Sequence, residues 1–183
     1  MERRKPSKEE ILQAAGKSLP DLIAPQLKVL LCGINPGLYS AAVQHHFARP
    51  GNRFWPALYK SGFTAELFTP DREHELLKDK IGITNIAQRA TASASELSAS
   101  ELIAGKERLL EKAKIYQPKL IAVLGITAYK TAFGEPKASY GLQKTLLHKS
   151  QIWVLPSPSG LNAHFSPAKL ATSFSELFLF LYS

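Results

Sequence analysis

Residues 27–34 read Leu-Lys-Val-Leu-Leu-Cys-Gly-Ile, a nearly continuous apolar run of the length of one β-strand. A strand with so little alternation of apolar and polar residues is typical of a sheet that is covered on both faces. The run is followed directly by Asn35-Pro36-Gly37, residue types that favour a tight turn. This strand and its turn predict a mostly parallel sheet between two layers of helices.

Short apolar runs continue to alternate with helical segments along the rest of the chain. Two capping boxes, Ser7-Lys8-Glu9-Glu10 and Ser98-Ala99-Ser100-Glu101, mark helix starts. We expect further strands at 81–85, 120–124 and 151–155, and helices at about 7–16, 52–61, 98–116, 127–133 and from 166 onward. No repeat or long linker divides the chain. The sequence therefore predicts a single α/β domain over residues 1–183, with three α/β/α layers around a short, mostly parallel four-stranded sheet.

The composition excludes several classes of protein. No apolar stretch approaches the ~20 residues of a membrane helix, and the N-terminus lacks an apolar signal core, so we expect an intracellular protein without membrane contact. It would work in the cytoplasm or nucleoid of a bacterium, or in the nucleus of a eukaryote. The single Cys32 excludes an internal disulfide, a four-cysteine zinc site and an iron–sulfur cluster. His45 and His46 lack a third ligand at typical spacing, so no metal is expected, and no cofactor.

Positively charged residues are in excess, and the acidic residues are unevenly distributed along the chain. The chain has 23 Lys and Arg against 15 Asp and Glu, and segments 22–65 and 136–175 contain no acid at all. Both segments keep cations, among them Arg53 and Lys149. Apolar strands and turns leave little room for acids, which is one explanation. We favour the other, that both segments face phosphates, which repel carboxylates. The basic tip within residues 1–6 is either a DNA-touching arm or a solubilising end.

Three loops leave the carboxyl ends of the expected strands, at 35–52, 85–97 and 156–165, where ligands bind in parallel α/β sheets. The first contains Asn-Pro-Gly-Leu, then His-His-Phe, then Gly-Asn-Arg-Phe-Trp, and the last begins Pro-Ser-Pro-Ser-Gly-Leu. In this order the motifs resemble the mismatch-specific uracil/thymine-DNA glycosylase (MUG/TDG) family of the uracil-DNA glycosylase superfamily, from about residue 18 to the end.

The resemblance implies a monofunctional enzyme of base-excision repair. Such an enzyme acts as a monomer on double-stranded DNA that contains uracil or a guanine mismatch. It flips uracil, chiefly opposite guanine, out of the duplex and hydrolyses the bond to the sugar, leaving an abasic site. Asn35 matches the residue that positions the attacking water. An amide orients water but cannot deprotonate it, so we expect slower turnover than in relatives with an aspartate at that place.

The same resemblance places further residues around the flipped base. Phe47 matches the aromatic residue that stacks on the pyrimidine, and Ile34 and His46 belong with it in the substrate-binding set. Two adjacent imidazoles suit a core poorly, which supports a functional role for this segment. The hydroxymethyl group of Ser40 should disfavour the methyl of thymine. Asn85 is either a reader of the uracil edge or an ordinary turn residue.

The last loop matches the loop that wedges into DNA. Leu161, an apolar side chain in a polar turn, would fill the gap left by the flipped base. Gly160 and Asn162 would read the guanine opposite through backbone groups, and Ser157 completes the substrate-binding set. Arg53, Arg89 and Lys149 are predicted to contact DNA, and Thr91 is a further candidate for a phosphate contact.

Other chemistries have less support in the sequence. There is no Gly-x-Ser-x-Gly elbow of a serine hydrolase and no Gly-rich phosphate-binding loop after the first strand. Nothing marks Lys144 or Lys149 as the buried lysine that a lyase requires. The remaining alternative is a DNA protein that binds a lesion or mismatch without cutting. It would use Phe47 and Leu161 but would have no use for Asn35.

Overall fold

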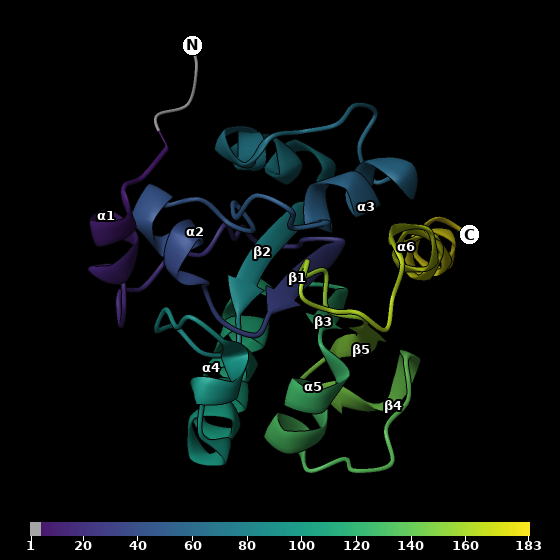
Figure 1. Cartoon of the computed structure of the whole chain (residues 1–183). Helices are drawn as coiled ribbons and strands as arrows, with labels where there is room; N and C mark the ends of the chain where they lie inside the picture. The colour runs from purple at the N-terminus through teal and green to yellow at the C-terminus, as the bar shows by residue number, and fades with distance from the viewer. Residues whose placement is uncertain (1–4) are drawn as a thin grey trace.

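Every apolar run predicted as a strand is a strand of one sheet in the computed structural model, which describes residues 5–183 (Figure 1). These strands are β1 (Val29–Gly33), β2 (Ile81–Asn85), β3 (Leu120–Leu124) and β5 (Ser150–Leu155). All residues of β1, β2 and β3 are buried, as expected for a sheet covered on both faces. The strand order is β2-β1-β3-β5-β4, and β1, β2, β3 and β5 run parallel.

The sheet has five strands rather than the predicted four. The additional strand, β4 (Gly141–Leu147), forms one edge of the sheet and runs antiparallel to β5. Its side chains are alternately half-buried and exposed until Leu147, and Leu142 and Leu146 are exposed. The sequence of β4 therefore lacks the continuous apolar run by which the central strands are found.

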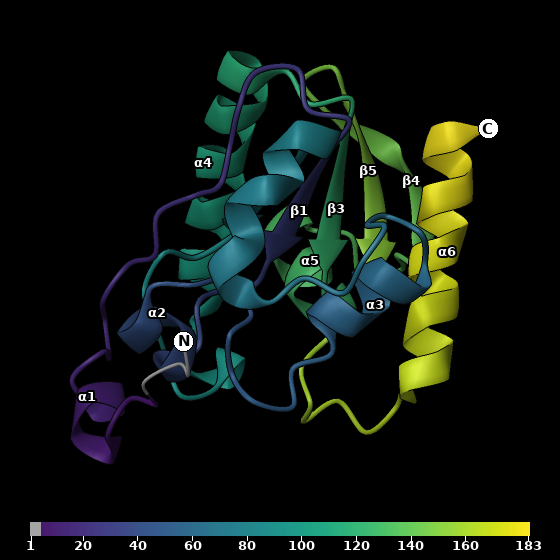
Figure 2. The same ribbon diagram turned by 90° about the horizontal axis from the view of Figure 1, so that it is seen from above.

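Successive strand residues point to opposite faces, and each face has its own helical cover. Val29 and Leu31 of β1 pack with α3 (Phe54–Lys60) and α6 (Pro167–Tyr182). Leu30 and Cys32 pack with α4 (Ala99–Tyr116) and α5 (Ile126–Phe133). Figure 2 shows the sheet between these layers, with α4 and α6 on opposite sides. The three-layer prediction is confirmed.

Most predicted helices are present, with boundaries shifted by a few residues. Both capping boxes form, at the starts of α1 (Lys8–Leu12) and α4. The sequence predicts neither α2 (Leu38–Val43) nor the 3₁₀ segments η1 (Pro70–Asp79) and η2 (Ala94–Glu96). α2 begins without a side-chain cap, and η1 buries only Leu76, so neither carries a strong helical signal.

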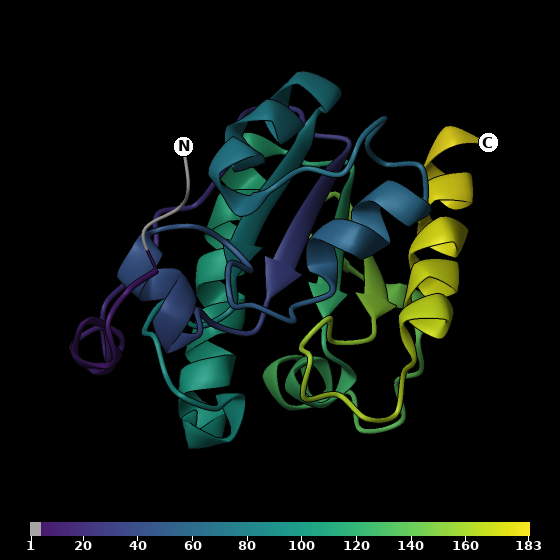
Figure 3. The ribbon, with the colours of Figure 1, turned by 45° about the horizontal axis from the view of Figure 1, so that its top comes forward.

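The parallel strands bring three loops to one edge of the sheet. Because β1, β2 and β5 point the same way, the segments that follow them meet at their carboxyl ends, at the lower edge of the sheet in Figure 3. A bridge between Gly37 and Thr91 joins the first two of these segments.

Within residues 5–183, no helix is both long and apolar enough to cross a membrane. Arg3 and Arg4 of the basic tip lie outside the described residues.

Candidate active site

A cleft of about 340 Å³ opens at the carboxyl edge of the sheet and is lined by all three loops. It brings together nine of the predicted site residues: Ile34, Asn35, Ser40, His46, Phe47, Asn85, Ser157, Leu161 and Asn162. The chain has only four asparagines, and all of them, including Asn52, line this cleft. No Asp or Glu belongs to the lining. The cleft is therefore rich in carboxamides and free of carboxylates.

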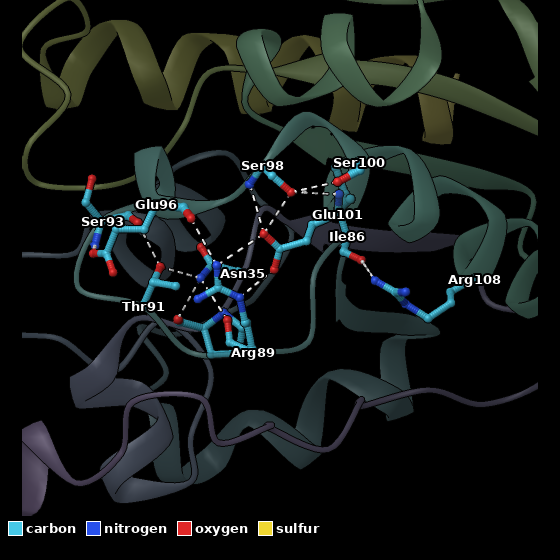
Figure 4. Close-up of polar contacts among 11 residues, drawn as sticks. Asn35, Ile86, Arg89, Thr91, Ser93, Glu96, Ser98, Ser100, Glu101 and Arg108 are labelled. Carbon is cyan, nitrogen blue, oxygen red and sulfur yellow. Dashed lines mark hydrogen bonds and ion pairs between the residues drawn. The ribbon is translucent and has the colours of Figure 1, made fainter.

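Asn35 is fixed in one orientation by the hydrogen bonds of its side-chain nitrogen. Nδ2 donates to the carbonyl of Pro36 at 3.2 Å, to the carbonyl of Arg89 at 3.0 Å and to Oγ1 of Thr91 at 2.7 Å (Figure 4). Carbonyl oxygens only accept, so the nitrogen, and not the oxygen, must face them. Among the described residues, none donates to Oδ1 of Asn35. That oxygen is left as an acceptor for a water molecule.

The hydroxyl of Thr91 accepts a hydrogen bond from Asn35 because its own proton is already used. Thr91 Oγ1 donates its own proton to the carbonyl of Ser93 at 2.8 Å. It therefore meets Asn35 as an acceptor. The sequence offers Thr91 only as a phosphate contact, and no sequence signal marks it as the partner of a residue 56 positions away.

Arg89 supports the carbonyl that Asn35 uses. Its guanidinium makes a two-pronged contact with Glu101, with Nη2 at 3.1 Å from Oε2, and Nη2 also donates to the carbonyl of Glu96 at 2.9 Å (Figure 4). The hydrogen bond from Arg89, followed by that from the backbone of Ser98, lowers the pKa of Glu101 to about 2. The structure thus places the Arg89 side chain on the protein, where the predicted phosphate contact would compete with this ion pair.

Phe47 lines the cleft. Its ring stacks on Phe54 with ring centroids 3.9 Å apart and planes 18° apart. The backbone of Phe47 is left-handed, with φ of 52°, a conformation that costs a non-glycine residue ~1–3 kcal/mol. The half-buried ring thus lies on a rigid aromatic support, as a stacking platform requires.

His46 is a buried residue, contrary to the expectation that these imidazoles avoid the core. It is 3% exposed, and Nε2 lies 2.9 Å from the carbonyl of Pro20. That carbonyl can only accept, so Nε2 carries the proton and Nδ1 is a bare acceptor. Burial lowers the pKa of His46 below 6.5. Its backbone N–H donates to Glu73 at 2.7 Å, an acid that lies outside the two acid-free segments.

The burial of His46 predicts a loss of stability in mild acid. Its pKa is lower in the folded than in the unfolded chain, so below about pH 6.5 the unfolded chain binds a proton that the native state does not. We expect the melting temperature of the wild type to fall more steeply from pH 7 to pH 5 than that of His46→Gln, by scanning calorimetry. Parallel pH profiles would contradict this.

Asn85 and Ser40 form further parts of the lining. Asn85 ends β2 beside Gly33 of β1 and is 7% exposed. No described residue hydrogen-bonds its carboxamide. A Cβ at Gly33 would overlap Oδ1 of Asn85, so glycine makes room for this carboxamide. Ser40 Oγ accepts from the backbone N–H of Ala48 at 3.0 Å and fixes the segment that carries His46 and Phe47.

The 156–165 loop exposes Leu161 and holds the residues around it. Leu161 is 70% exposed, and Asn162 Nδ2 donates to the carbonyl of Ser157 at 3.0 Å. Gly160 packs against Gly51, whose carbonyl would lie 2.7 Å from a Cβ at Gly160. Arg53, predicted to contact DNA, directs its guanidinium at backbone carbonyls of this loop.

Lys149 is not brought to the cleft. It precedes β5, and the loop follows that strand, so the length of Ser150–Leu155 separates them by ~20 Å at ~3.3 Å per residue. Lys149 therefore does not belong to the cleft or the wedge loop, and its contact with DNA stays a prediction. The residue lies at the amino end of a parallel strand, away from the edge where the loops meet.

Two comparisons with known proteins concern the family and the fold. Residues 20–178 match the model of the uracil DNA glycosylase superfamily. The fold is similar to the solution NMR structure of a candidate uracil DNA glycosylase from Methanosarcina acetivorans, with a TM-score of 0.62 and 20% sequence identity over 92% of this chain and 99% of that one. At that identity the structural similarity shows a common fold.

Proposed function

The chain belongs to the uracil DNA glycosylase superfamily, and on this premise we propose that it is a monofunctional glycosylase of the mismatch-specific branch. Its substrate is uracil in double-stranded DNA, chiefly opposite guanine. The observation that carries this proposal is the fixed carboxamide of Asn35, whose nitrogen is bound to protein while its oxygen remains free at the cleft.

The cleft can supply each requirement of glycosidic hydrolysis. The flipped uracil stacks on the ring of Phe47, and the unpaired carboxamide of Asn85 offers both a donor and an acceptor to its edge. Asn35 Oδ1 accepts a hydrogen bond from a water molecule. This bond points a lone pair of the water oxygen at the sugar carbon from which uracil leaves. Orientation of this kind lowers the barrier without proton transfer.

The lining contains no strong base. It includes no carboxylate, and the lowered pKa of His46 makes that imidazole a weak base. The departing uracil takes the bonding electrons as an anion, so the water can attack an oxocarbenium-like sugar before it is deprotonated. The proton that the water then loses passes to the uracil anion or to solvent. Slow, water-orienting catalysis follows from this lining.

The test is single-turnover release of base from matched duplexes. We expect uracil opposite guanine to be released at least tenfold faster than uracil opposite adenine, because the weaker pair opens more readily. Thymine opposite guanine should be slower by ~10–200-fold, the usual discrimination for one methyl group. Tight binding to the mismatched duplexes without release of any base would instead support a non-catalytic lesion-binding protein.

A further inference from the structure

One arginine from a distant segment holds the loop that carries Leu161. Arg53 precedes α3, and its Nη1 donates to the carbonyl of Phe165. Its Nη2 donates to the carbonyls of Ser159 and Asn162, the latter at 2.9 Å. The backbone N–H of Arg53 donates to the carbonyl of Pro158 at 3.0 Å. Each of these four acceptors belongs to the 156–165 loop.

The charge of Arg53 has no carboxylate partner among residues 5–183. Its half-buried guanidinium meets only backbone carbonyls, and its Nε is buried without a hydrogen bond. Carbonyl dipoles compensate a cation less fully than a carboxylate does, and desolvating the guanidinium costs free energy. Arg89, by contrast, pairs with the carboxylate of Glu101. The hydrogen bonds of Arg53 all go to the backbone of the 156–165 loop.

Two further contacts hold the tip of the loop, while the side chain of Leu161 stays exposed. Gly160 lies against the backbone of Gly51, and Asn162 Nδ2 closes the turn on Ser157. Between them, Leu161 remains 70% exposed. The backbone at the tip of the loop is held in place while the apolar side chain is exposed. This arrangement suits insertion of the side chain into a DNA duplex.

We propose that Arg53 is a positioning residue that preforms the 156–165 loop for insertion of Leu161 into the duplex. This inference rests on the proposed function. Ordering a loop at the moment of binding costs conformational entropy, and a preformed loop avoids that cost. Arg53 thus acts through the loop, whereas the sequence predicts that it contacts DNA itself.

The first test does not depend on catalysis. Hydrogen exchange of the amides of residues 159–162 is measured in the protein without DNA, for wild type, Arg53→Gln and Arg53→Lys. We expect much faster exchange in Arg53→Gln and an intermediate rate in Arg53→Lys, because an ammonium cannot span the same set of carbonyls. The control Lys114→Gln removes an equal charge from the far end of α4 and should exchange as the wild type does. Unchanged exchange in Arg53→Gln would overturn the proposal.

The second test measures insertion and excision. Fluorescence of 2-aminopurine beside the uracil reports opening of the duplex whether or not the base is released. We expect Arg53→Gln to lower this signal and to slow release from duplex DNA by about 10–100-fold. In a Leu161→Ala background, Arg53→Gln should add little.

The outcomes separate the two proposals. Full additivity with Leu161→Ala, or slowed release with an unchanged 2-aminopurine signal, would overturn the positioning role and leave the glycosylase intact. Duplex opening without release of uracil by the wild type would reject the proposed function, while the fluorescence and exchange results would still decide the role of Arg53. Absence of duplex opening by every protein would overturn the role of Arg53.

Discussion

Asn35→Ala is expected to slow single-turnover release of uracil by about 10²–10³-fold, the usual cost of removing one preorganised polar group. Binding of the uracil-containing duplex should stay within a few-fold of wild type, because the wedge loop and Phe47 are untouched. The rate is measured with enzyme in excess, and binding by fluorescence anisotropy. Gln151→Ala, which removes an exposed amide at the amino end of β5, should change neither quantity. Equal loss of binding and rate would contradict a role in positioning water.

A second variant at the same position separates orientation from basicity. Asn35→Asp would introduce a base, yet its carboxylate would face the carbonyls of Pro36 and Arg89, which only accept hydrogen bonds. Repulsion between these oxygens should turn the side chain or raise the pKa of the new carboxyl group. We therefore expect Asn35→Asp to be slower than wild type at neutral pH. A faster variant would show that this pocket accepts a carboxylate.

Gly33→Ala is expected to lower kcat/KM for uracil in duplex DNA by about 100-fold while leaving the fold intact. The added methyl would overlap Oδ1 of Asn85 and would lie 3.3 Å from Cζ of Phe47. Asn85 can move because its carboxamide ends a rotatable side chain, so we expect only a small change in melting temperature. Displacement of that carboxamide removes the groups proposed to read uracil.

A double-mutant cycle tests whether Gly33→Ala acts through Asn85. In an Asn85→Ala background the space occupied by the carboxamide is empty, and Gly33→Ala should then have little further effect on kcat/KM. The four proteins are compared on uracil opposite guanine, with thermal unfolding measured for each. Additive losses would mean that the methyl blocks the cleft by itself and that Asn85 is the turn residue which the sequence also allows.

The strands could be predicted because their signal is local. β1 and β3 are buried on both faces, and strands buried in this way read as nearly continuous apolar runs. β4 is not predicted because alternate side chains along it are exposed, and these exposed positions hold Lys144 as well as Leu142. α2 is not predicted because it has only six residues and no side-chain cap, and η1 is not predicted because it is a 3₁₀ segment that buries only Leu76.

The location of the site could be predicted from the sequence, but the hydrogen-bond partners of its arginines could not. Parallel strands send their following loops to one edge, so the cleft between the three loops follows from the strand assignments. A sequence shows that Arg53 and Arg89 are cations without showing which acceptor each finds. Both bind protein, one to loop carbonyls and one to Glu101. The distance of Lys149 from the loop is hidden in the sequence for the same reason, since it depends on strand direction.

The junction between Asn35 and Pro36 also bears on chemical ageing. Asparagine converts spontaneously to aspartate when the backbone nitrogen of the next residue gives up its hydrogen and attacks the carboxamide carbon. The nitrogen of Pro36 carries no hydrogen. The three acceptors around Nδ2 further restrain the rotation that such an attack requires. An old molecule of this protein should therefore keep its amide at position 35, and with it the hydrogen-bond polarity of the cleft.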